Sequence, residues 1–200
     1  MKFILFFFIL ITLNANEIKN HYSLRAAYGV ASENDLGEIL SGSFGTHSRD
    51  LSVYSLDGGY LLKKEVFDWP IDIYVKGGIS YFDEDEFDNM IEATFYVKAY
   101  LNLDFWGNRA RLGVAEGVSY APHVPESEAI ESTAENDESS KFLNYLDISL
   151  DFDFGRLIGF TPMYETYIGY ALKHRSGVFG LYNGVHGGSN YNMCYLEKNF

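Results

Sequence analysis

Two side chains in the last quarter of the chain, His174 and Ser176, have the types and spacing of a nucleophilic pair. Residues i and i+2 of a β-strand point to the same side, so an imidazole and a hydroxyl at these positions are neighbours. Such a histidine can take the proton of the serine hydroxyl as the serine attacks an acyl carbon. The spacing therefore permits acyl transfer, although two polar residues that merely meet water at a loop give the same pattern.

The expected neighbour of this pair is Asn190. Counting back in steps of two from the terminal Phe200 points Asn190 outward, as the preceding alternation does for His174 and Ser176. A group that binds the second ring nitrogen of a histidine fixes its tautomer and orientation. Asn190 can do this without supplying the charge that stabilises an imidazolium. The same count makes the upper half of the last strand polar, so either a bulge breaks the alternation or polar groups face outward for a functional reason.

Alternation with a period of two recurs along the chain and predicts long β-strands. In residues 91–105, apolar side chains such as Ile91 and Phe95 share one face, and polar ones such as Glu92 and Lys98 share the other. Strands of about 10 residues with one apolar face are typical of a membrane β-barrel. The segments are roughly His21 to Ala31, Leu51 to Lys63, Ile71 to Phe82, Ile91 to Phe105, Arg109 to Tyr120, Phe142 to Phe154, Tyr164 to Arg175 and Ser189 to Phe200. We therefore predict an all-β fold, an eight-stranded antiparallel transmembrane barrel of the outer membrane.

The connections between these segments alternate in length, as they do in outer-membrane barrels. Short turns are expected around Asp68 to Pro70, Trp106 to Asn108 and Gly155 to Pro162. With both ends of the mature chain in the periplasm, these turns are periplasmic and the longer links are extracellular. His174 and Ser176 then lie near the outer leaflet. A barrel of this size is filled by side chains, so we expect no wide pore.

Charged residues are expected both inside the barrel and in its loops. Asp147, Asp151 and Asp153 alternate with apolar residues and so point inward. Their expected partners are inward basic residues such as Arg109, Arg111, Lys76 and Lys98. Two acidic runs, residues 83–86 and 126–138, are interpreted as solvated loops.

The N-terminal segment has the pattern of a secretory signal peptide. Lys2 precedes an apolar run from Phe3 to Leu13, and Ala15 supplies a small residue for cleavage. The run is too short for a membrane-spanning helix, which needs about 20 apolar residues. We predict removal of residues 1–15, with cleavage at the neighbouring Asn16 as the alternative, and residues 16–200 as a single barrel domain.

The composition argues against several classes of function. A formal net charge of −13 disfavours binding to the phosphate backbone of a nucleic acid. The single Cys194 cannot form an internal disulfide. We expect no metal site and no cofactor, because the remaining histidines lack metal-ligand spacing: His21, His47, His123 and His186.

The C-terminal quarter resembles the PagL-type lipid A 3-O-deacylases, also called acyloxyacyl hydrolase-like proteins. The resemblance is carried by His174-Arg175-Ser176-Gly177-Val178-Phe179-Gly180 and by Gly187-Gly188-Ser189-Asn190-Tyr191. Members of that family are eight-stranded outer-membrane barrels with a lipid-facing His-x-Ser pair. The resemblance implies Ser176 as nucleophile and His174 as general base, then acid.

The chain departs from the family pattern at two positions. The family has an acid on the final strand where this chain has Asn190, and Glu116 and Glu165 are the alternative acids. The family also tends to have Asn directly after the serine, where this chain has Gly177. Backbone N–H groups of residues 177–180 are candidate substitutes as oxyanion donors.

The function that the resemblance implies is that of a serine-type carboxylic ester hydrolase. It would remove an ester-linked (3-O) acyl chain from lipid A, with lipopolysaccharide and the outer-membrane bilayer as partners, and a homodimer is compatible with the sequence. The alternative is a non-catalytic barrel that acts in adhesion or membrane integrity through its extracellular loops.

Overall fold

The computed structural model describes residues 21–135, 139–178, 180–182, 184–185 and 187–200. The predicted signal peptide, Phe179 and His186 lie outside the described residues.

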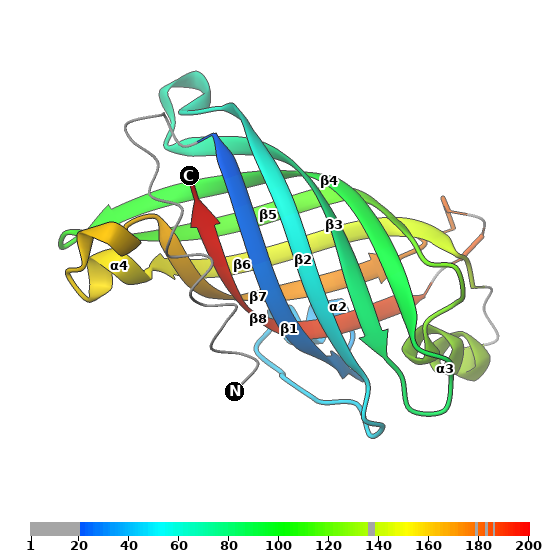
Figure 1. Cartoon of the computed structure of the whole chain (residues 1–200). Helices are drawn as coiled ribbons and strands as arrows, with labels where there is room; N and C mark the ends of the chain where they lie inside the picture. The colour runs from blue at the N-terminus through cyan, green and yellow to red at the C-terminus, as the bar shows by residue number, and fades with distance from the viewer. Residues whose placement is uncertain (1–20, 136–138, 179, 183, 186) are drawn as a thin grey trace.

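Eight strands form a closed antiparallel barrel in sequence order, and β8 pairs back to β1 (Figure 1). Each strand begins and ends within two residues of its predicted limits, so the predicted fold class is confirmed. The strands are β1 (Tyr22–Ser32), β2 (Ser52–Lys63), β3 (Ile71–Asp83), β4 (Met90–Phe105), β5 (Asn108–Tyr120), β6 (Phe142–Asp153), β7 (Thr166–Ser176) and β8 (Gly188–Asn199).

The alternation of β8 is unbroken, which decides between the two interpretations of its polar upper half. Its residues pair one by one with β7 and with β1, without a register shift. Tyr191, Met193 and Tyr195 are buried, while Cys194 is exposed. Asn190 and Asn192 therefore point outward with Cys194. A register shift occurs instead in β2, between Leu61 and Lys63.

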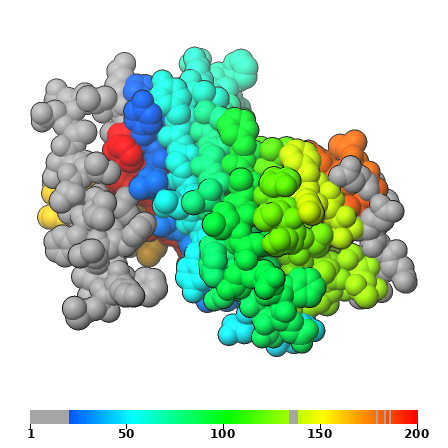
Figure 2. Space-filling view, turned by 45° about the vertical axis from the view of Figure 1, so that its right-hand side comes forward, coloured from blue at the N-terminus to red at the C-terminus, as the bar shows by residue number. Residues whose placement is uncertain are grey.

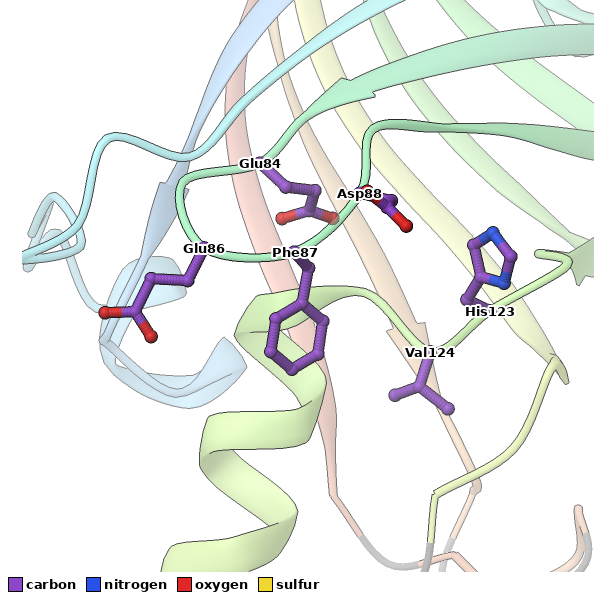
Figure 3. Close-up of a pocket in the computed structure, with 6 residues that line it drawn as sticks. All are labelled: Glu84, Glu86, Phe87, Asp88, His123 and Val124. Atoms are coloured by element: carbon purple, nitrogen blue, oxygen red, sulfur yellow. The ribbon is translucent and has the colours of Figure 1, made fainter.

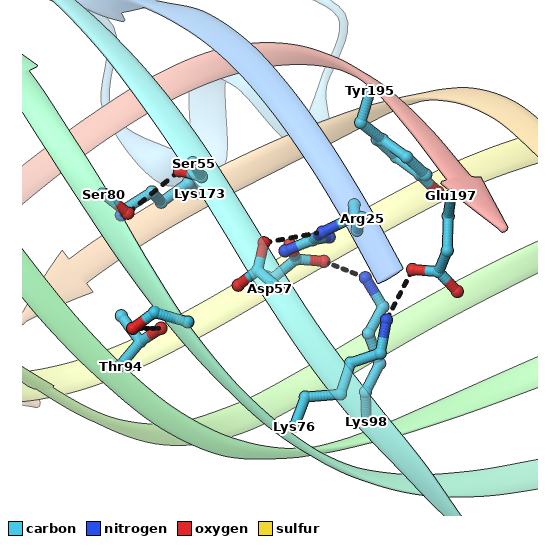
Figure 4. A network of polar contacts seen from close by, with 12 residues as sticks. Arg25, Ser55, Asp57, Lys76, Ser80, Thr94, Lys98, Lys173, Tyr195 and Glu197 are labelled. Atoms are coloured by element: carbon cyan, nitrogen blue, oxygen red, sulfur yellow. Dashed lines mark hydrogen bonds and ion pairs between the residues drawn. The ribbon is translucent and has the colours of Figure 1, made fainter. Parts of the chain in front are cut away.

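Buried ion pairs fill the interior of the barrel (Figure 4). Arg25 contacts Asp57 at 3.2 Å and Asp147 at 2.7 Å, and Asp147 also pairs with Lys98. Lys76 pairs with Glu197 at 2.5 Å. The interior of this small barrel is thus occupied by paired side chains, as expected for eight strands.

The predicted partners of the inward aspartates are partly correct. Asp147 pairs with Lys98 and Asp151 with Arg111, as expected. Asp153 instead lies 3.1 Å from Arg156, and its carboxylate also accepts the Arg156 backbone N–H. Arg109 instead contacts Asp104 at 2.6 Å near the β4–β5 turn. Asp104 is the direct cross-strand partner of Arg109 at the end of β4, and Arg156 lies in α4 just after β6, so both pairings are local to the turns at this end of the barrel.

The outer wall exposes apolar side chains along its strands, and Figure 2 shows side chains of β2 to β6 packed side by side there. Ile91 and Phe95 are each 60% exposed, whereas Glu92 and Lys98 on the other face are 0% exposed. An apolar outside and a polar inside is the arrangement of outer-membrane barrels.

Among the described residues, no helix is both long enough and apolar enough to cross a membrane.

Short turns join the strands at the end of the barrel where β1 begins and β8 ends. Trp106 and Gly107 connect β4 to β5 with φ values of 46° and 80°, as a two-residue hairpin turn requires. Trp106 is 99% exposed and Trp69 is 65% exposed at the same end, as aromatic residues of an interfacial girdle are. The remaining turns contain short helices: η1 (Val66–Asp68), α4 (Phe154–Leu157) and η2 (Thr161–Met163).

The longer links lie at the opposite end and are tied together by an acidic residue. They contain α2 (Leu36–Leu40) and α3 (Glu126–Glu135). The Glu126 carboxylate accepts the backbone N–H groups of Asp85, Glu86 and Phe87 at 3.0, 2.9 and 3.2 Å and also pairs with Arg49. One carboxylate thereby joins three loops.

This arrangement corrects the expectation of a solvated loop for the acidic run 126–138, of which residues 136–138 lie outside the described residues. Glu126 is 0% exposed and Glu128 is 3% exposed. Charge runs usually face water because burial of a charge is costly. Here backbone N–H groups and Arg49 compensate the charge of Glu126. These partners come from other loops, so the sequence of the acidic run does not reveal them.

Candidate active site

The structure brings His174 and Asn190 into contact on the outer wall. The two residues are directly paired across β7 and β8, and His174 Nδ1 lies 2.8 Å from Asn190 Oδ1. Asn190 Nδ2 donates to the backbone carbonyl of Asn34 at 3.1 Å, so its amide group is oriented with Oδ1 towards the ring. Because Oδ1 only accepts, Nδ1 must carry a proton. In the neutral ring, Nε2 then carries the lone pair and is the basic atom.

Ser176 lies two residues further along β7, on the same face as His174. Its direct cross-strand partners are Asn144 on β6 and Gly188 on β8. In the described part of the chain, no hydrogen bond joins Ser176 to His174. Such nucleophile–base bonds are often long without substrate and tighten in the complex. The structure therefore places the two side chains on the same face of β7, without a hydrogen bond between them.

Neither alternative acid contacts the His174 ring. Glu165 precedes the first residue of β7, at the end of the strand opposite to His174. Glu116 lies on β5, two strands away from β7, and pairs across β5 and β6 with Leu146. Asn190 is thus the residue at Nδ1, and Glu116 is a second outward polar group at the same level.

Asn144 connects Glu116 to the surroundings of Ser176. Its Nδ2 atom donates to the Glu116 carboxylate and, at 3.2 Å, to the backbone carbonyl of Gly117. Leu146, directly opposite His174, is the apolar neighbour on β6. The outward polar residues thus continue from Asn190 across β7 to β5.

The link between β1 and β2 folds back over the outer wall on the β8 side. The backbone carbonyls of Asn34 and Gly45 accept hydrogen bonds from Asn190 and Asn192, the second at 3.2 Å. The Phe44 ring packs edge-on against Tyr170, with centroids 5.8 Å apart. Sequence reasoning missed this segment, because its contacts are made by backbone carbonyls, which no residue type identifies.

The link between β7 and β8 contacts β6, where the rings of Tyr182 and Phe142 have centroids 5.9 Å apart. The N–H groups of Gly177 and Gly180 donate within this link, to Gly187 at 3.2 Å and to Val185 at 2.8 Å. Two of the candidate oxyanion donors are therefore already engaged. Val178 lies between them with φ of 48°, a conformation that is rare for a β-branched residue and recurs at functional sites.

Helix α3 supports the pair from inside the barrel. Glu128 Oε1 accepts the Ser189 hydroxyl at 2.8 Å and forms an ion pair with Arg175 Nε at 2.9 Å, without the alignment of a hydrogen bond. Arg175 lies between His174 and Ser176, and Ser189 precedes Asn190. Sequence reasoning missed Glu128, since it occurs within a charge run.

A separate cavity of about 350 Å³ opens among the loops over β3 and β4 (Figure 3). It is distinct from the outward site on β7. Among the described residues, no three His, Cys, Asp or Glu side chains converge as a metal site would require. The cavity is lined by Glu84, Glu86, Phe87, Asp88, His123 and Val124.

Comparison with known proteins identifies a similar fold. No family model matches the chain. No curated protein matches it either. A solved structure, described as the crystal structure of the outer membrane enzyme PagL, matches with a TM-score of 0.59 and 11% sequence identity. The match covers 89% of this chain and 99% of that chain. At this identity the similarity concerns the fold.

Proposed function

We propose that this protein is an outer-membrane ester hydrolase that removes an ester-linked (3-O) acyl chain from lipid A. The observation that carries the proposal is the outward position of His174 and Ser176, with the ring held through Nδ1 by Asn190. A nucleophilic pair on the outside of a barrel is useful only for a substrate that is itself in the membrane. The fold similarity to the outer membrane enzyme PagL supports the same location. Residues 1–15 would direct export and be removed.

In the proposed mechanism, His174 Nε2 takes the Ser176 hydroxyl proton while Ser176 Oγ attacks the ester carbonyl carbon. The carbonyl oxygen becomes an oxyanion, for which the Val178 N–H is the proposed donor. Collapse of the intermediate breaks the ester C–O bond, and His174 returns the proton to the leaving alcohol. Water, activated by the same ring, then releases the fatty acid from Ser176.

In the proposed mechanism, Asn190 orients His174 from the position where the PagL-type family has an acid. The carbonyl of Asn34 fixes the Asn190 amide, and Asn190 fixes the Nδ1–H tautomer of His174. The role of a neutral partner is orientation, because it adds no charge to stabilise the imidazolium.

A non-catalytic barrel is the second candidate. It is favoured by the loops that Glu126 joins into one extracellular surface, which is suited to contact with another cell or molecule. In that case Ser176 and His174 are outward polar residues that catalyse no reaction.

The test is to express the protein in a host of known lipid A structure and to analyse that lipid A by mass spectrometry. Loss of one hydroxyacyl chain, abolished in Ser176→Ala and in His174→Ala, supports the hydrolase. Unchanged lipid A in the presence of a folded barrel contradicts it and leaves the second candidate.

Asn190→Glu is the companion variant. A carboxylate at Nδ1 would stabilise the imidazolium as well as orient the ring, so we expect greater deacylation. Lower activity, or none, would show that the third position requires the amide oriented by Asn34.

A further inference from the structure

On the outward face, where an outer-membrane barrel normally has apolar side chains, Glu116 is exposed and the neighbouring Asn144 is 5% exposed. Glu116 is on the outward face of β5, where its neighbours on the same face, Leu112 and Val114, are 44% and 54% exposed. Ionisable residues in contact with the membrane are costly and usually functional. Glu116 is at the level of His174, and Asn144 is opposite Ser176, so the two residues border the proposed site.

The hydrogen bonds of Asn144 determine what this pair can recognise. Nδ2 of Asn144 donates one hydrogen towards Glu116 and one to the carbonyl of Gly117. An amide NH₂ group has two hydrogens, so the donor side of Asn144 is used. What remains for a ligand is Oδ1 of Asn144 and the Glu116 carboxylate, which accept hydrogen bonds and cannot donate them.

A subsite made of acceptors excludes two occupants. It cannot hold the oxyanion, because a carboxylate beside a developing negative charge would raise the barrier. It also disfavours a phosphate, for the same electrostatic reason. It suits neutral donors, the hydroxyl and amide N–H groups that a sugar of a glycolipid carries.

We propose that Glu116 and Asn144 form a specificity subsite that binds hydroxyl and amide N–H donors on the sugar of a glycolipid substrate. The leaving alcohol then lies over β6, which is adjacent to β7 in the barrel, and over β5, the next strand beyond it (Figure 1). The acyl chain lies on the other side of Ser176, over β7 and β8, where Tyr170 and Phe44 provide an aromatic surface. This assignment rests on the proposed hydrolase function and adds the orientation of its substrate.

The experiment compares two ligands that share one acyl chain. The first is a glucosamine with an N-acyl and an O-acyl group, and the second is the methyl ester of the same fatty acid, which has no donor. Binding is measured with purified, folded protein in lipid nanodiscs in the Ser176→Ala background, so that hydrolysis does not interfere. Glu116→Gln removes the charge, and Asn144→Leu removes both polar groups of the amide while suiting a lipid-facing position.

We expect Glu116→Gln to weaken glucosamine-lipid binding about fivefold and Asn144→Leu about tenfold, as loss of charge-assisted hydrogen bonds predicts. Binding of the methyl ester should stay unchanged. Glu65→Gln, the same chemical change in an exposed turn at the opposite end of the barrel, is the matched control and should leave both ligands unaffected. Equal effects on both ligands, or no effect on either, would overturn the subsite.

Failure of the hydrolase proposal would look different. Protein with Ser176 intact would then leave both esters uncleaved, while the difference in binding between the two ligands would persist. A barrel that has lost its fold is recognised by its altered migration in unheated gels. If Asn144→Leu folds poorly, Glu116→Gln still tests the subsite, because it keeps the shape of the side chain.

Discussion

The interior of the barrel and the outer wall of β5 to β8 both carry polar side chains. Those discussed inside are paired with one another, whereas two of those outside, His174 and Ser176, are not hydrogen-bonded to each other. Inside, Arg25, Asp147 and Lys98 satisfy one another, and Arg111 meets both Asp151 and Glu197. Outside, Ser176 and His174 lie side by side without a mutual hydrogen bond among the described residues. In the interior, paired charges fill the space and stabilise the fold. On the outside, hydrogen-bonding groups that have not used all their donors and acceptors can bind a ligand.

The largest expected effect tests the chemical side of this comparison. Ser176→Ala and His174→Ala should each lower deacylation by about 10⁴-fold or more, since members of a nucleophilic set act as a unit. Both side chains point outward, so the unfolding transition of the barrel should be nearly unchanged. Mass spectrometry of lipid A and urea unfolding in vesicles measure the two quantities. An active Ser176→Ala variant would exclude Ser176 as nucleophile.

Asp147→Ala tests the structural side. It leaves Arg25 and Lys98 without their shared carboxylate inside the barrel. Removal of one partner of a buried ion pair costs about 3–5 kcal/mol, because the remaining charge is uncompensated. We expect a lower free energy of unfolding and unchanged activity per folded molecule. The reverse result, loss of activity in a stable barrel, would show that the interior takes part in the chemistry.

Glu128→Gln probes the point where the two regions meet. Glu128 contacts Arg175 and Ser189 from inside, and these residues are the chain neighbours of His174, Ser176 and Asn190. Without the charge, the register of β7 and β8 near the pair should loosen, and kcat should fall about tenfold with little change in KM. A proportional loss of stability with unchanged kcat would make Glu128 a purely structural residue.

The smallest expected effect concerns the pH dependence of the longer loops. Burial, together with the nearby Glu126 and Glu128, raises the pKa of Glu84 from its ordinary 4.5 to about 7. A raised carboxyl pKa favours the protonated form in the folded loops, so this stabilisation is complete below pH 4.5 and is lost as the pH rises to about 7.

Hydrogen exchange of residues 84–88, measured between pH 5 and 8 and corrected for the intrinsic rate, should therefore show increasing opening at higher pH. Glu84→Gln should remove that dependence without changing activity at the outer wall. Persistence of the trend in Glu84→Gln would assign it to another group.

Much of the barrel follows from the sequence, because inward and outward residues alternate on every strand. The alternation from Ile91 to Phe105 gave the correct face for Glu92 and Lys98 as well as for Phe95. The same rule applied from Phe200 gave the direction of Asn190, which the unbroken pairing of β8 maintains. A period of two is a local property of the backbone, so it can be read without knowing the rest of the fold.

The alternation of residues along the strands predicts less of the candidate site than of the barrel. The sequence by itself determined the fold class, the strands and the shared direction of His174, Ser176 and Asn190. The tertiary structure alone decided that the carbonyl of Asn34 orients Asn190, that Asn144 turns its donors to Glu116, and that buried Glu128 contacts Arg175. These contacts join segments far apart in the chain, and they depend on how loops fold over the barrel and on which atoms of a polar group are already used. Neither the path of the loops nor the use of individual polar atoms follows a periodic pattern in the sequence.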